Sequence, residues 1–261
     1  VLRNCFRHPL RTALTALGII VAITAFGLLR TTVDAWYAGA EASSASRLVV
    51  RNKNSLMFPL PLYYRNRIEQ LEGVKSVSYA DWFGGIYIDR KNFFPQFAVE
   101  PLSYFPMYPE FVVPPEQMKA FQLDRRGAIV GRKTAEKYGW KVGDQIPPIG
   151  TVFAGNWSFV LRGIYHGADA RTDESQFFFH WDNLNETVKR ILPDKANQVG
   201  IFLVALEDPS TAPALSEQID GMFANSRAET LSETEKAFQL SFVAMTEAIL
   251  LVIQVVSFLI I

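Results

Sequence analysis

The pattern of hydrophobic positions is dominated by two long apolar segments at the two ends of the chain. Residues 12–29 carry no charge over 18 positions, and residues 237–261 carry one, Glu247, over 25 positions. At a rise of about 1.5 Å per residue, a helix of either length crosses a hydrocarbon core of about 30 Å. We therefore predict two membrane spans. Because no polar flank follows Ile261, we also expect the chain to be the front part of a longer membrane protein.

Basic residues ahead of the first apolar segment predict its orientation. Arg3, Arg7, Arg11 and His8 precede it and no acid does, so the positive-inside rule places residues 1–11 in the cytoplasm. With spans at residues 12–36 and 237–261, the region between them lies on the far side of the membrane. The alternative is a cleaved signal peptide ending near residues 38–40, which are small. Against it, the apolar segment exceeds the roughly 7–15 residues of a signal core.

The two ends of the region between the spans share an alternation of strands and amphipathic helices. The expected strands are residues 47–51, 74–83, 97–100 and 200–206, and the expected helices are residues 61–72 and 209–224. Gly73 follows the first of these helices and is a typical C-terminal stop. We therefore predict one α+β lobe built from residues 37–103 and 196–236.

The middle of the region, residues 104–195, is predicted to be a second, mixed α/β lobe inserted into the first. It begins within a segment rich in proline and aromatic residues, 101–115, which is typical of an irregular connection. Helices are then expected at residues 115–121, 132–138 and 181–191, and strands at residues 128–130, 157–165 and 176–180. The predicted fold class is α+β, a two-lobed extracytoplasmic domain flanked by transmembrane helices.

Composition narrows the classes of partner. The net charge is zero, so the chain lacks the electrostatic footprint of a nucleic-acid-binding protein. Cys5 is the single cysteine and is expected on the cytoplasmic side, so the exported region has no disulfide. That region of about 200 residues is long enough to be stabilised by its own hydrophobic core.

Four motifs, in this order along the chain, resemble permease subunits of the MacB/FtsX-like ABC transporter family. They are the opening at residues 2–21, the helix–strand junction LEGVKSV at residues 71–77, the stretch at residues 129–144 that includes AEKYGWKVGD, and the strand FVLRGIY at residues 159–165. Together they cover the first span and both predicted lobes, which makes chance similarity improbable.

The resemblance implies a permease in the bacterial inner membrane, with four transmembrane helices and a large periplasmic domain between the first two. Such permeases act as dimers with two ATPase subunits or domains, which bind ATP and magnesium, and some work with a periplasmic adaptor. ATP-driven closure on the cytoplasmic side is transmitted mechanically to the exported domains. Members of that family expel antibiotics, toxins or haem from the periplasm, extract lipoproteins, or activate cell-wall hydrolases. This chain departs from the pattern by stopping within the second helix.

Catalytic chemistry finds little support in the sequence. Residues 127–134 have three residues between two glycines where a phosphate loop needs four, and Arg132 precedes the lysine, so a strand–turn–helix junction is the better interpretation. The histidines have no metal-ligand spacing, and the acids at residues 169–174 are typical of a solvated turn. We therefore expect no enzyme, cofactor or metal in this chain and place the ATPase on a partner.

Three charged residues near the membrane are candidate helix-contact residues. Arg30 and Asp34 are spaced i, i+4 just past the first span and pair on one helix face if both point the same way. Glu247 lies within the second apolar segment, where an ionised carboxylate needs a partner, a cavity or the interface. The simpler alternatives are a snorkelling arginine and a glutamate near the membrane boundary.

Aromatic residues are the other candidate. Interleaved with prolines, they are expected either to line a surface for an apolar ligand or partner protein, or to fill the seam of a hinge between the lobes. The residues chosen are Phe94, Phe97, Tyr104, Phe105 and Tyr108.

Two other functions fit two spans around an exported domain. One is a membrane-anchored sensor of an extracytoplasmic ligand, and the other is a scaffold that recruits an envelope hydrolase. Two further spans after Ile261 favour the permease, whereas a cytoplasmic signalling helix favours the sensor. The sequence does not predict the identity of the substrate, because one fold serves unrelated functions.

Overall fold

The computed structural model describes residues 9–41, 46–241 and 243–244 and divides the chain into two compact units. One unit contains residues 1–43 and 236–261, and the other contains residues 44–235. The first described helix, α2 (Pro9–Glu41), has 33 residues, so it is about 50 Å long. Its segment Leu10–Leu28 is the one helix among the described residues that is long and apolar enough to cross a membrane.

Apolar side chains of α2 are exposed around the helix, including Leu10, Ile20 and Ile23. A helix that is hydrophobic all round and not covered by protein is typical of a membrane span. Most of the second predicted span, residues 245–261, lies outside the described residues; residues 235–241 and 243–244 ahead of it are helical.

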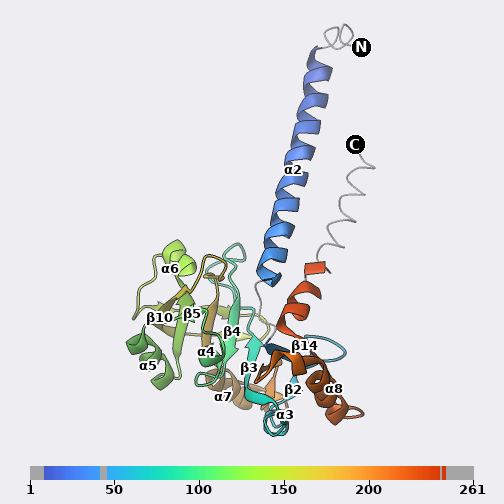
Figure 1. Ribbon diagram of the computed structural model, residues 1–261. Coiled ribbons are helices and arrows are strands. Elements are labelled where there is room, and N and C mark those ends of the chain that lie inside the picture. Colours follow the sequence, from blue (N-terminus) through green and yellow to red (C-terminus); the bar gives the residue numbers. More distant parts are fainter. Residues whose placement is uncertain (1–8, 42–45, 242, 245–261) are drawn as a thin grey trace. The chain divides into compact units, whose positions relative to one another are not determined.

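Residues 44–235 are organised around one ten-stranded sheet, with β10 near one end and β14 at the other (Figure 1). The strand order is β14 (Thr230–Thr234), β1 (Arg47–Asn52), β13 (Ile201–Leu206), β3 (Val74–Trp82), β4 (Gln96–Val99), β11 (Phe177–His180), β6 (Gly127–Gly131), β10 (Phe159–Gly167) and β5 (Phe111–Val112), with β7 (Gln145–Ile146) also on β10. Two small sheets pair β12 (Gln198–Val199) with β2 (Leu60–Pro61), and β8 (Ile149–Gly150) with β9 (Gly155–Asn156).

A single parallel pair joins the two halves of this sheet. β4 pairs with β11 in register from Gln96 opposite Phe177 to Val99 opposite His180. On one side of that pair the strands come from residues 37–103 and 196–236, and on the other side they come from residues 104–195. The inserted segment therefore continues the sheet of the segments that flank it. The mixed α+β class is confirmed, and the lobe boundaries stay a prediction.

Six helices of residues 44–235 accompany the sheet: α3 (Tyr64–Ile68), α4 (Tyr104–Met107), α5 (Pro115–Leu123), α6 (Arg132–Tyr138), α7 (Trp181–Ile191) and α8 (Ala212–Phe223), with 3₁₀ turns at Pro193–Lys195 and Pro209–Thr211. Gly139 ends α6 in the left-handed conformation, at φ 69°, as a glycine C-cap does. Gly73 has a positive φ of 85°, but the helix before it is shorter than the predicted residues 61–72, because β2 occupies its expected start and a turn occupies its expected end.

The sheet buries aromatic side chains on both faces, most clearly at β11. Phe177 and Phe179 belong to the large core cluster, while Phe178 points to the opposite face and contacts Tyr104 and Phe105. All three phenylalanines are at most 1% exposed, as expected when successive side chains of a fully buried strand alternate between two packed faces.

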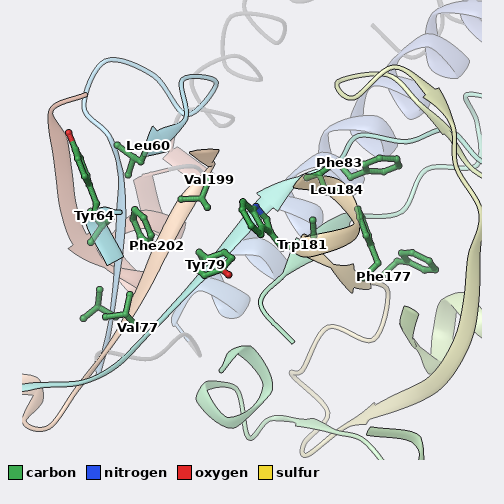
Figure 2. Close-up of a cluster of buried hydrophobic side chains, with 14 of the residues drawn as sticks. Leu60, Tyr64, Val77, Tyr79, Phe83, Phe177, Trp181, Leu184, Val199 and Phe202 are labelled. Carbon is green, nitrogen blue, oxygen red and sulfur yellow. The ribbon is translucent and has the colours of Figure 1, made fainter. Parts of the chain in front are cut away.

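One cluster crosses from one half of the sheet to the other. The Tyr79 ring lies 6.5 Å from Phe202 and 5.0 Å from Trp181, the first residue of α7. In Figure 2, Tyr79 and Trp181 lie between Phe202 on one side and Phe83 on the other. The two halves therefore share a continuous hydrophobic core.

Candidate functional site

A buried cluster of charged residues lies where the chain enters and leaves this unit. Arg47 is the first residue of β1, and Glu235 directly follows β14. These strands are antiparallel neighbours, with Leu48 opposite Thr234, so the start of one meets the end of the other. The two connections to the flanking segments are thus held side by side.

Arg47 binds residues from three parts of the chain. Its Nε donates to Glu235 Oε2 at 2.6 Å, and its Nη2 donates to Glu110 Oε1 at 2.6 Å. Its Nη1 donates to the Met107 carbonyl oxygen at 2.9 Å. Its Cζ lies 4.2 Å from the ring centroid of Tyr108, whose hydroxyl donates to Glu235 Oε1 at 3.1 Å. One guanidinium thus joins both chain connections to residues 107–110.

Burial makes these charges interdependent. The side chains of Arg47 and Glu235 are each 9% exposed, and that of Glu110 is 32% exposed. Burial by itself lowers the pKa of Arg47, but the Glu235 and Glu110 carboxylates outweigh it and hold that pKa above its ordinary value. Burial raises the pKa of Glu235, and Arg47 opposes this shift without cancelling it. Burial and the Glu235 carboxylate raise the pKa of Tyr108.

From this cluster an aromatic path leads to the inserted half of the sheet. Tyr104 stacks on Tyr108 with ring centroids 4.7 Å apart, and its ring lies 5.3 Å from Phe178 of β11. These rings are buried, so their packing is close and a displacement at one end meets resistance along the path. The arrangement holds together segments that are far apart in the sequence.

The five aromatic residues singled out from sequence lie where the halves of the sheet join. Tyr104, Phe105 and Tyr108 pack on the Phe178 side of β11, and Phe94 lies on the Phe177 side, with ring centroids 5.8 Å apart. Phe97 packs on Phe178 and is half-buried. Four of the five are at most 6% exposed, so these rings fill the interior where the two halves join. The hinge and the ligand surface both stay predictions.

The charged residues near the membrane stay predictions. Arg30 lies in α2 and is exposed. Glu247 and the side chain of Asp34 lie outside the described residues.

The segments weighed for catalysis have structural roles. Residues 127–134 form β6 and the start of α6, and Arg132 pairs with Glu174 at 2.9 Å. His180 Nε2 lies 2.6 Å from the Phe121 carbonyl oxygen, and burial lowers the pKa of this histidine. Within the described ranges, no three His, Cys, Asp or Glu side chains are grouped to hold a metal ion.

Sequence reasoning missed the Arg47 cluster. Arg47 and Glu235 are 188 residues apart, so no local spacing relates them. The available signal was weak: an arginine at the start of the apolar run RLVV, where a buried charge requires a partner.

Comparison with known proteins agrees with this architecture. The sequence matches the MacB-like periplasmic core domain over residues 12–222, which is most of the chain. No curated protein sequence matches it significantly.

Two solved structures share the fold. The periplasmic region of MacB from Actinobacillus actinomycetemcomitans has a TM-score of 0.51 at 8% identity and covers 76% of this chain and 92% of its own. The extracellular domain of the ABC-type transporter YknZ from Gram-positive bacteria has a TM-score of 0.50 at 12% identity and covers 72% of this chain and 98% of its own. The chain therefore belongs to the MacB-like periplasmic core domain family, and the resemblance to MacB/FtsX-like ABC permeases is confirmed.

Proposed function

We propose that this chain is a permease subunit of an ABC transporter that couples ATP hydrolysis on a partner subunit to movement of residues 44–235. In this account the N-terminus is cytoplasmic, and the domain carried by residues 44–235 is periplasmic or extracellular. A second permease copy, membrane lipid and an ATPase that binds ATP and magnesium complete the machine. A periplasmic adaptor is a further expected partner, and the movement drives export or extraction of a substrate.

The observation that carries the proposal is the Arg47 cluster at the entry and exit of the exported domain. Separating a buried ion pair by removing or withdrawing one partner costs several kcal/mol. A displacement of the chain at Arg47 is therefore expected to carry Glu235 and residues 107–110 with it rather than to break the contacts. Such a joint converts movement of the flanking segments into movement of the domain.

Copurification tests the proposal. The complete reading frame is expressed in its native host, extracted in mild detergent, and its companions are identified by mass spectrometry. A stoichiometric subunit with a phosphate loop and vanadate-sensitive ATP turnover is the expected result. A histidine kinase module in the same polypeptide contradicts the transporter and supports a sensor. An envelope hydrolase recovered without any ATPase contradicts it and supports a scaffold.

A further inference from the structure

A cavity of about 550 Å³ opens between the two halves of the exported domain. One wall comes from the loop at residues 56–59 and from the end of β3, which belong to the first half. The other wall comes from residues 152–154 and from the last turns of α7, which belong to the inserted half. This volume lies within the range of about 300–1,000 Å³ typical of small-molecule sites, which often lie where two domains meet.

The wall of this pocket is mostly apolar, and much of it is open to solvent. Met57 is 72% exposed, Phe58 56%, Ile191 61% and Leu192 52%. These four side chains come from both halves and gather around one cavity, whereas single exposed apolar residues need no explanation. A gathered apolar surface around a cavity indicates a ligand with an apolar body.

A buried acid is the exception in this wall. Asp81, on β3, is 7% exposed, and its Oδ2 accepts a hydrogen bond from Trp181 Nε1 at 2.6 Å. Burial raises the pKa of Asp81 to about 7, against the opposing hydrogen bonds from Trp181 and the Gly200 backbone N–H. Both of these donors are neutral, so the carboxylate has no cation paired with it. Lys195 is the one other charged residue of the wall, and it is exposed.

The buried Asp81 carboxyl group favours a ligand with a positive charge over a neutral or anionic one. A carboxylate removed from water is stabilised by a cation that can also donate hydrogen bonds, and an ammonium group does both. An anionic ligand brings a second negative charge towards Asp81 and leaves the buried acid without a cation. A neutral ligand gains the apolar contacts and at most an uncharged hydrogen bond to Asp81, which is weaker than a charge-assisted one.

We propose that this pocket binds a compact lipophilic amine, with its ammonium group at Asp81 and its apolar body against Phe58, Ile191 and Leu192. The inference does not depend on the proposed function, because a transporter and a sensor can each carry such a site.

Binding of three matched probes tests the proposal on the full chain in lipid nanodiscs. The probes are 4-phenylbutylamine, the neutral 4-phenylbutanol and the anionic 4-phenylbutyrate, followed by tryptophan fluorescence with empty nanodiscs subtracted. Trp82 and Trp157 line the pocket and report occupancy. We expect saturable binding in the order amine, alcohol, carboxylate, with about tenfold or more between the first two, as one ion pair supplies.

Three variants assign the binding to the pocket. Asp81→Asn is expected to abolish the preference for the amine, whereas Asp194→Asn, which removes an exposed carboxylate outside the wall, leaves it unchanged. Ala154→Trp fills the cavity from an exposed position and is expected to weaken the amine and the alcohol alike. This variant keeps the test valid if Asp81→Asn unfolds. The proposal is overturned if the amine shows no saturable binding, if the alcohol or carboxylate binds as tightly, or if Ala154→Trp has no effect.

Discussion

Replacing Arg47 by methionine is expected to destabilise the exported domain by about 3 kcal/mol or more. Methionine keeps an apolar stem of similar length but removes the cation, so Glu235 remains buried without its counter-ion. Breaking a buried pair from one side costs about 3–5 kcal/mol. Protonation of Glu235, whose pKa is already raised by burial, limits the cost and favours the lower end of that range.

Two further variants distinguish the contribution of the buried Arg47–Glu235 pair from that of the more exposed Glu110. Arg47→Met combined with Glu235→Leu replaces both charges by apolar groups and is expected to recover most of the loss, because no unpaired charge is left. Glu110→Gln removes the more exposed partner, and solvent screening limits its effect to about 1 kcal/mol. The double variant is therefore more stable than Arg47→Met alone, a strongly non-additive result that contacting residues produce.

Urea denaturation of the full chain in nanodiscs measures these differences. Four of the five tryptophans, Trp82, Trp140, Trp157 and Trp181, lie in residues 44–235, so fluorescence reports that domain rather than the membrane helix. A double variant no more stable than Arg47→Met, or an Arg47→Met that costs no more than Glu110→Gln, shows that the buried Arg47–Glu235 pair does not stabilise the domain as expected.

Three other changes have defined outcomes in the same assay. In the folded protein the pKa of Asp81 is raised from 3.8 to about 7, so the stabilisation from its protonated form is lost as pH rises through 7. Between about pH 4 and pH 8 the free energy of unfolding of the wild type should therefore fall by up to about 4 kcal/mol relative to that of Asp81→Asn. Parallel curves of unfolding free energy against pH for the two proteins contradict this. Gly131→Ala places a Cβ against the backbone of Glu174 and should destabilise the domain by about 1–3 kcal/mol. Gly221→Ala, inside α8 with open space around it, should stabilise the domain by about 0.5–1 kcal/mol. The opposite order of stabilities contradicts the close approach of backbone at Gly131. Phe178→Ala should cost about 3–5 kcal/mol, and Phe93→Ala, which is 62% exposed, should be nearly neutral; equal effects exclude the two-faced core.

Strong local patterns predicted most of the elements. The strands β1, β3 and β13 and the helices α6, α7 and α8 lie close to their expected positions, because each has an apolar period and a glycine, proline or polar boundary. β14 was missed because its sequence, TLSET, has one large apolar residue and forms at the edge of the sheet by pairing with β1. Its strand character comes from the partner rather than from its own pattern.

The functional residues were less accessible to sequence reasoning. The aromatic run around Tyr104 and Tyr108 was recognised, but composition alone does not distinguish a surface from a buried seam. The structure shows both rings to be buried, because Tyr104 packs on Phe178 of β11 and Tyr108 stacks on Tyr104. The pairing of Arg47 with Glu235 and the place of Asp81 in a pocket depend on strand order, which no single sequence segment encodes.

If ATP hydrolysis moves the exported domain, as we propose, the distance between the domains of two permease copies changes during the hydrolysis cycle. Leu123, at the exposed end of α5, is replaced by cysteine in a background with Cys5→Ser, and the label on each permease copy is observed by double electron–electron resonance in the complex with its ATPase. We expect the distance distribution to shift between the nucleotide-free and the vanadate-trapped states. A distribution that stays the same while the complex hydrolyses ATP contradicts it.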